Sequence, residues 1–239
     1  MTGAGTAPWN LPRTKQGSPQ PVSQTWLRDR IVDAPRDVAS HVARQRLTAI
    51  AATSINPALC LRAQQMVERC GNLADVVRSV AQEIHLLEAE PGYDVSHSEP
   101  CWLHRVLVSV PDRLDEVGAL RFTEGLIHEA MHLELTLLEN EQALVRNPND
   151  TMPSPWREEP RPIGGVLHGL YVFSCLYAAF AMVADSTDAA GAVHIEGRLH
   201  DISEEIRSID LSRLSAGLTP LGCGLANRWS SVVANDAGR

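Results

Sequence analysis

Residues 114–146 read LDEVGALRFTEGLIHEAMHLELTLLENEQALVR, and this stretch decides the fold. Apolar side chains occupy nearly every face of its central part, a pattern that predicts one long helix buried on almost all sides. Asn147 and Pro148 follow it, and a proline disfavours helical conformation in the residue before it. Together with the helical patterns elsewhere in the chain, this stretch predicts a mainly α fold.

A second apolar stretch, residues 166–184, is long enough to be weighed as a membrane span, because about 20 residues cross a bilayer. It carries His168 in its first turn with Gly169 beside it, no basic cluster flanks it, and it occurs alone. These features favour a buried core helix that begins near Gly164.

The rest of the chain supplies shorter elements around these two helices. Asn56–Pro57 and Thr219–Pro220 are typical helix starts, with a capping side chain before a first-turn proline. The other helices are expected over about 33–52, 56–71, 72–87 and 195–208, a strand over 102–110, and a polar loop over 147–163. The predicted fold class is a compact multi-helix domain with one or two short strands.

Composition limits the partners and the compartment. Residues 1–24 are rich in Pro, Gly, Ser, Thr and Gln, which predicts a flexible arm before a single helical domain over residues 25–239. The net charge of −8 and the lack of basic runs argue against nucleic acid and membranes as partners. Five scattered cysteines and the lack of a secretory signal predict a cytoplasmic protein. The oligomeric state is not indicated.

The central part of the long helix contains HEAMH, a match to the HExxH pattern, at residues 128–132. Residues four apart share one helix face, so His128 and His132 can chelate one metal ion. A helix this apolar would bury two imidazoles and a carboxylate at a cost unless a metal or hydrogen-bond partners satisfied them. The alternative is an ordinary helix with two core histidines.

A catalytic metal needs a third ligand, and His168 is the main candidate because it begins the next apolar helix. The metal site would then lie between the HExxH helix and that following helix. Glu139 shares a face with His132, but it would sit about 10 Å further along the helix, too far to bind the same ion. The alternative for His168 is a core histidine bonded to backbone.

Other charged residues near the motif have open roles. Glu129 would be the general base in a zinc peptidase, whereas an oxygen-activating iron site does not require proton chemistry from it. Glu124 either accepts from an imidazole N–H or pairs on the surface with Arg121 or Arg146. His41, His85, His194 and His200 fit surface or satisfied core positions, and His97 and His104 flank the expected strand.

The loop SPWREEPRP, residues 154–162, is stiffened by three prolines. Arg161 precedes His168 by seven residues and would lie near the same pocket, where a guanidinium can bind a carboxylate through two parallel hydrogen bonds. Arg157 could serve similarly. The alternative is a surface loop in which both arginines pair with Glu158 and Glu159.

Two segments carry a resemblance to a known family. EGLIHEAMH at residues 124–132 and SPWREEPRPIGGVLHGLYVF at residues 154–173 resemble the HExxH-type peptide β-hydroxylases of ribosomal peptide natural-product clusters. That resemblance implies Fe(II) and 2-oxoglutarate as cofactors and a ribosomal precursor peptide as substrate. It also implies His128, His132 and His168 as iron ligands, and Arg161 as the residue that holds 2-oxoglutarate.

Three hypotheses follow. The leading one is an iron(II)- and 2-oxoglutarate-dependent peptide hydroxylase, although three imidazoles depart from the usual two-histidine, one-carboxylate iron site. The second is a zinc metallopeptidase with Glu129 as general base, because imidazole suits both metals. The third is a helical binding module whose histidines are structural.

Overall fold

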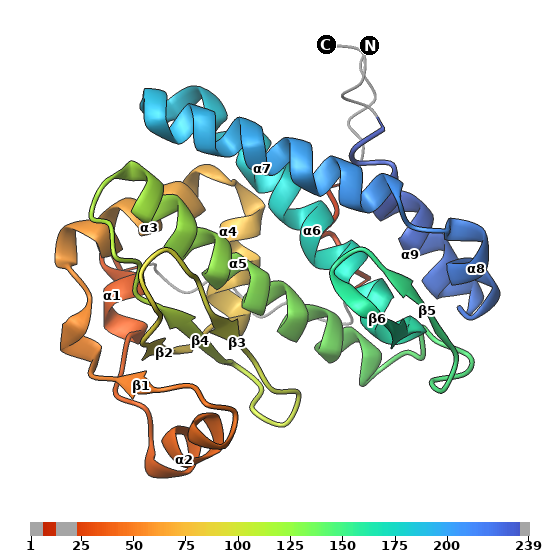
Figure 1. Cartoon of the computed structure of the whole chain (residues 1–239), viewed down its shortest axis with the longest axis horizontal. Helices are drawn as coiled ribbons and strands as arrows, with labels where there is room; N and C mark the ends of the chain where they lie inside the picture. Colours follow the sequence, from red (N-terminus) through yellow and green to blue (C-terminus); the bar gives the residue numbers. More distant parts are fainter. Residues whose placement is uncertain (1–6, 13–22, 235–239) are drawn as a thin grey trace.

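The computed structural model describes residues 7–12 and 23–234, most of which are helical. In that part of the chain the helices are α1 (Trp26–Arg30), α2 (Arg36–Arg44), α3 (Pro57–Arg69), α4 (Asn72–Val80), α5 (Glu116–Glu139), α6 (Ile163–Val183), α7 (Ala189–Arg207), α8 (Leu211–Ala216) and α9 (Pro220–Ser230). Short 3-10 turns follow β1 and α6 as η1 (Ala52–Ser54) and η2 (Ala184–Ser186). The expected mainly α, compact fold is confirmed (Figure 1).

The chain contains more strands than the one or two that the sequence predicted. They are β1 (Ala49–Ile50), β2 (Glu83–Leu87), β3 (Ser96–His97), β4 (Arg105–Ser109), β5 (Thr151–Ser154) and β6 (Arg157–Pro162). The first four form a sheet in the order β1-β2-β4-β3, in which β2 and β4 run parallel and the other pairs antiparallel. β5 and β6 form a separate antiparallel pair.

Both faces of the four-stranded sheet are covered, since alternate side chains of a strand point to opposite faces. Val106 and Val108 of β4 join the main core with α5, whereas Leu107 joins Leu87 of β2 in a smaller core against α2. A strand buried on both faces reads as a continuous apolar run. The helix expected over 72–87 was therefore wrong in its second half, where α4 ends at Val80 and β2 begins three residues later.

The loop expected over residues 147–163 is mostly the hairpin of β5 and β6. Pro162 pairs with Thr151 at the open end of this hairpin, a position where a proline is tolerated because β6 is an edge strand. The hairpin lies beside the N-terminal end of α6 (Figure 1). It therefore holds the segment around Arg161 against the helix that carries His168.

Helix α6 is the core helix that the sequence predicted, and α5, α7 and α9 pack around it (Figure 1). The segment Ile163–Ser186 has a mean hydropathy of 1.8 over its most apolar window and could span a membrane by length and composition. Because 72% of that window is buried inside the protein, the helix has little apolar surface left for lipid. The burial favours a core helix over a membrane span.

Two capped helix starts are confirmed and one is shifted. Asn56 Oδ1 accepts a hydrogen bond from Ala58 N at the start of α3, and Thr219 Oγ1 accepts one from Gly222 N at the start of α9. Asparagine is a favoured N-cap residue, and Asn72 lies at the start of α4. The cap residue is instead Gly71, with φ at 60°, and the Asn72 side chain serves a different contact.

That contact involves part of the predicted N-terminal arm. Trp9 is only 1% exposed, and its Nε1 donates to Asn72 Oδ1 over 2.8 Å. The carbonyl of Pro8 accepts from Trp229 Nε1 at 3.1 Å. Residues 7–12 therefore pack on the core, because Trp9 and Leu11 bury their apolar side chains there. The polar composition of the surrounding residues had led to the prediction of a flexible arm. The rest of the predicted arm, residues 1–6 and 13–22, lies outside the described residues.

Candidate metal centre

His128 and His132 project from successive turns of α5. Asp115 caps the start of this helix by accepting from Gly118 N. The two imidazole rings lie 4.9 Å apart between centroids with their planes at 62°, as expected for residues four apart on one helix face. His128 remains 26% exposed, so its ring can turn without disturbing the core.

His168, in the second turn of α6, meets His132 across the contact between the two helices. The Nδ1 atoms of these rings are 3.2 Å apart, and the rings stack with 5.4 Å between centroids. Metal–nitrogen bonds of about 2.0–2.1 Å place neighbouring ligand atoms roughly 3 Å apart. The spacing fits a shared ion, and it equally fits a hydrogen bond in which His132 Nδ1–H donates to His168.

The other nitrogen of His168 has a carboxylate partner. His168 Nε2 lies 2.8 Å from Glu139 Oε2, so a neutral His168 that donates from Nε2 keeps a lone pair on Nδ1, facing His132. Metal-binding histidines commonly carry such a carboxylate on the nitrogen that does not face the ion. Glu139 was dismissed as a direct ligand, and the structure assigns it to His168 instead.

His132 has the electrostatic character of a ligand. Burial lowers its pKa well below the usual histidine value, and electrostatic repulsion from His128, His168 and Arg161 lowers it further. A neutral imidazole is the form that binds metal ions. His132 therefore offers a lone pair at neutral pH.

The three histidines are not yet arranged around one point. In the described part of the chain, their potential ligand atoms do not all lie within 4.8 Å of one another, whereas those of His41, His97 and Glu99 do. Binding one ion would therefore require the His128 ring to turn toward the other two. Three imidazoles are suitable ligands for a transition-metal ion. Only the distance between His132 Nδ1 and His168 Nδ1 already matches that of two ligand atoms on one ion.

Glu129 lies beside the motif with its carboxylate already engaged. It is 4% exposed, and it accepts hydrogen bonds from Ser96 Oγ at 2.6 Å and Ser98 Oγ at 2.5 Å. One of its oxygens is 3.9 Å from His128 Nε2. The two hydroxyl donors hold the carboxylate in place, and each occupies an acceptor position on one of its two oxygens.

Arg161 and Arg157 both lie on β6, but only Arg161 lies against the histidine helix. Atoms of its guanidinium group are 3.3–3.5 Å from the place where a Cβ on Gly165 would stand, one turn before His168. Burial, and then the charge of Arg157, lower the Arg161 pKa. Among the described residues no carboxylate pairs with either arginine, so the expected alternative of pairing with Glu158 and Glu159 is not observed.

An aromatic stack connects the hairpin to His128. The rings of Trp156 and Phe173 stack with 4.9 Å between centroids, and Phe173 meets the His128 ring edge-on at 5.5 Å. Trp156 also fills the space above Gly169, where an added Cβ would come within 2.2 Å of its ring. These contacts explain why a tryptophan, a glycine and a phenylalanine accompany the histidine in residues 154–173.

His128 also lines a pocket of about 430 Å³. Its lining includes Ser96 and Val108 from the sheet, Gly125 from α5, and His194 from α7. Buried polar atoms without a hydrogen-bond partner in the described chain include His194 Nε2 and the donor Arg121 Nη2, both from residues that line this pocket. The pocket can therefore accept a polar group with hydrogen-bond acceptors.

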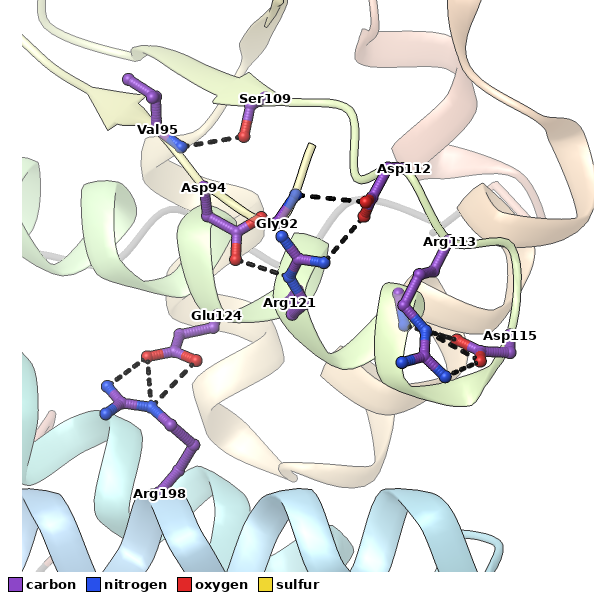
Figure 2. A network of polar contacts seen from close by, with 11 residues as sticks. Gly92, Asp94, Val95, Ser109, Asp112, Arg113, Asp115, Arg121, Glu124 and Arg198 are labelled. Carbon is purple, nitrogen blue, oxygen red and sulfur yellow. Dashed lines mark hydrogen bonds and ion pairs between the residues drawn. The ribbon is translucent and has the colours of Figure 1, made fainter. Parts of the chain in front are cut away.

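The charges around this pocket are arranged in pairs (Figure 2). Arg121 donates to Asp94 at 2.7 Å and to Asp112 at 2.9 Å, and Arg198 binds Glu124 through two nitrogens at 3.1 and 2.6 Å. Glu124 was expected to pair with an imidazole or with Arg121 or Arg146, and its partner on α7 was not predicted. These contacts connect α5 to the loop before β3, to the loop after β4 and to α7.

Sequence reasoning considered Glu139 only as a metal ligand and missed its contact with His168, and it did not name Ser96 or Ser98. The spacing of Glu139 seven residues after His132 was a usable signal, since it put both on one helix face. No local pattern could have placed the two serines, because their contact with Glu129 depends on how the sheet packs against α5.

No protein-family model matches the sequence, and a search of curated proteins gives no match either.

Proposed function

We propose that the chain is an iron(II)- and 2-oxoglutarate-dependent oxygenase that hydroxylates the β-carbon of a residue in a peptide. The observation that carries this proposal is the contact of His132 with His168 one turn from His128, beside an arginine that has no acidic partner in the described chain. The family resemblance of these same segments supplies the reaction class. The peptide is a ribosomal precursor, and the enzyme acts in the cytoplasm.

His128, His132 and His168 would hold the iron. When bound, iron and 2-oxoglutarate together supply oxygen activation, with oxidative loss of carbon dioxide from the cosubstrate. Glu139 holds the His168 ring with Nδ1 free, and burial keeps His132 neutral. These residues present lone pairs to a cation at neutral pH without prior loss of a proton.

Arg161 would bind the distal carboxylate of 2-oxoglutarate. A guanidinium fork matches a carboxylate in shape and charge, and partial burial against α6 strengthens that interaction because less water screens it. Arg157 sits nearer the exposed turn of the hairpin and contributes positive potential at a greater distance. The peptide would enter through the pocket beside His128, where Arg121 Nη2 and His194 Nε2 have no hydrogen-bond partner in the described chain.

The runner-up is a zinc metallopeptidase with Glu129 as general base, favoured by the 3.9 Å approach of Glu129 to His128 Nε2. The hydrogen bonds from Ser96 and Ser98 argue against it, because they engage both carboxylate oxygens, one of which a general base needs for the attacking water. In the oxygenase Glu129 is a positioning residue. It fixes α5 to Ser96 in β3 and to Ser98 just after that strand.

The test is turnover by the iron-loaded protein. We expect succinate to form from 2-oxoglutarate and a precursor peptide encoded beside its gene to gain one oxygen atom, both measured by mass spectrometry. Arg161→Gln should raise the KM for 2-oxoglutarate roughly ten- to hundredfold, because it removes a hydrogen bond to a charged group. Arg36→Gln, an exposed arginine on α2, is the matched control. An iron-loaded protein that never consumes 2-oxoglutarate would contradict the proposal.

Glu129→Gln separates the oxygenase from the peptidase. It should leave most of the iron-dependent oxidation intact, because the amide can still accept from a serine hydroxyl. In a zinc peptidase the same change abolishes peptide cleavage, since the base that activates water is lost. Metal analysis of the purified protein tests the third hypothesis, a binding module with structural histidines. That hypothesis predicts that the protein carries no metal at a stoichiometric level.

A further inference from the structure

A second group of metal-binding side chains lies on the far side of β3 from the motif. His41 of α2 and His97 of β3 both contact Glu99: His41 Nε2 lies 2.9 Å from Glu99 Oε1, and His97 Nε2 lies 3.0 Å from the same oxygen. Their ligand atoms all fall within 4.8 Å of one another, which makes them a compact candidate cation site in the described chain. Sequence reasoning gave neither histidine a role as a ligand.

The spacing of these three groups suits a transition-metal ion. Bonds of about 2.0–2.2 Å to nitrogen and oxygen place neighbouring ligand atoms roughly 3 Å apart, close to the two distances above. The side chains are 27%, 21% and 22% exposed for His41, His97 and Glu99, so water can complete the coordination. Burial would raise the Glu99 pKa, but hydrogen bonds from His41, Gln45 and His97 outweigh it and lower the pKa.

The segment SHSE, residues 96–99, connects this group to the candidate metal centre. Side chains along an extended segment alternate between its two sides. Ser96 and Ser98 turn to one side and hold the Glu129 carboxylate, whereas His97 and Glu99 turn to the other and meet His41. An ion bound on one side would therefore fix the backbone that positions both serines on the other.

We propose that His41, His97 and Glu99 bind a divalent transition-metal ion, zinc being the probe of choice, as a structural clasp between α2 and the segment 96–99. This site is separate from the three histidines of α5 and α6, and it does not depend on the proposed function. Two histidines and a carboxylate are also the commonest donor set for non-haem iron. We nevertheless assign this group a structural role, because the pocket of about 430 Å³ lies beside His128, on the opposite side of the segment 96–99.

The surroundings of the site are compatible with a clasp. The indole of Trp102 meets the His41 ring at 4.6 Å between centroids, which restricts how that ring can turn. Arg44 Nη2 lies 3.2 Å from His41 Nδ1. When His41 binds a cation through Nε2, its proton resides on Nδ1, so the exposed guanidinium of Arg44 turns to solvent.

Zinc titration of the full-length, metal-free protein against a chromogenic chelator tests the proposal. With both centres functional, we expect two ions per chain. His97→Gln should lose one of them, because it removes a direct ligand. The zinc affinity of that site should fall by more than the roughly 10–100-fold that is lost when a group hydrogen-bonded to a metal ligand is removed. His132→Gln should lose the other and keep the clasp. His200→Gln, an exposed histidine on α7, is the control and should leave both unchanged.

The two proposals fail in different ways. If zinc binding is the same in wild type and His97→Gln, the clasp is excluded, whatever His132→Gln does. If 2-oxoglutarate turnover is lost in His97→Gln and kept in His132→Gln, the ion at His41 is catalytic and a structural clasp is excluded. One ion lost only in His97→Gln supports the clasp and counts against the three-histidine centre.

Amide hydrogen exchange tests the clasp without substituting His41, His97 or Glu99, so the test does not depend on whether such variants fold. In His132→Gln, saturating zinc should slow amide exchange in α2 and in residues 95–99, relative to the same protein with chelator. Unchanged exchange in both segments would overturn the clasp.

Discussion

At the scale of single residues, His168 shows how one ring can serve two partners. Its Nε2 lies against Glu139 and its Nδ1 faces His132. When Nε2 donates to the Glu139 carboxylate, the lone pair of the neutral ring is on Nδ1, which can accept a hydrogen bond or bind a metal ion. Glu129 has the opposite situation, because both its oxygens accept from serines. The acidic residue inside the motif is thus held in place, and the acidic residue outside it supports a candidate ligand.

Glu139→Gln tests this division. We expect metal affinity to fall roughly 10–100-fold, because the amide orients the His168 ring less firmly and makes it less basic. Competition with a chelator measures the affinity, using zinc in the His97→Gln background so that only the three-histidine centre contributes. Glu196→Gln, an exposed glutamate on α7, should have no effect. Equal affinity in both variants would show that Glu139 has no part in the site.

How much of the site was predictable differs from residue to residue. The i, i+4 spacing was enough to put His128 and His132 on one face, and the start of the next apolar helix was enough to put His168 near them. That these rings bind a metal stays a prediction. The partnership of His41 with His97 could not be found, because it joins residues 56 apart through a sheet whose strand order the sequence did not reveal.

At the scale of elements, the contact of the hairpin with α6 depends on Gly169. An added Cβ there would lie 2.2 Å from the Trp156 ring, and Trp156 stacks on Phe173, which touches the His128 ring. A small residue on the helix thus determines where an aromatic ring stands, and through it how one candidate ligand is packed.

Gly169→Ala should destabilise the fold by about 1–3 kcal/mol, the usual cost of overpacking a filled site. Urea unfolding measures the change. Gly197→Ala is the matched control in α7, where no atom lies within 4 Å of the new Cβ, and it should stabilise the protein by up to about 1 kcal/mol because alanine favours the helix. Equal effects of the two changes would mean that Trp156 does not occupy the space above Gly169.

The N-terminal cap of α5 gives a pH-dependent prediction. Hydrogen bonds from Arg113 and from the amide of Gly118 lower the Asp115 pKa to about 2, against about 3.9 in an unfolded chain. The stabilisation is therefore complete above about pH 4 and is lost as the pH falls toward 2. The difference in urea midpoint between wild type and Asp115→Asn should be constant from pH 7 to pH 5 and should narrow toward pH 3. A difference that stays constant to pH 3 would exclude the carboxylate as its source.

Element prediction succeeded where an apolar stretch was long and failed where a strand buried on both faces gave a short apolar run. α5 and α6 are long and apolar, so length alone identified them as helices. β2 carries four buried residues in succession, and this run resembled the end of the preceding helix. The hairpin of β5 and β6 was taken for a loop because prolines and charges fill an edge pair that hardly enters the core.

At the scale of the whole molecule, the candidate metal centre joins the two longest core helices. α5 is fixed to the sheet through Val106 and Val108 and to α7 through the Glu124–Arg198 pair, while α6 is surrounded by α5, α7 and α9. An ion shared by α5 and α6 would bind the folded chain and not the unfolded one. Metal binding should therefore raise the free energy of unfolding of the whole chain.

Zinc added at about 100 times its dissociation constant should stabilise the His97→Gln protein by about 2.7 kcal/mol. For a chain of this size that corresponds to a rise in Tm of roughly 5–10 °C, measured by calorimetry. His97→Gln/His168→Gln should show little of this rise. A full rise in the double variant would place the stabilising ion somewhere other than between α5 and α6.

The most direct measurement is a crystal structure of the iron-loaded protein with 2-oxoglutarate, using anomalous scattering at the iron edge to locate the metal. We predict an anomalous peak within about 2.2 Å of a ring nitrogen from each of His128, His132 and His168, with the His128 ring turned inward and Arg161 on the distal carboxylate of 2-oxoglutarate. If the three rings carry no peak and His132 simply donates a hydrogen bond to His168, the centre does not exist and the oxygenase proposal fails with it.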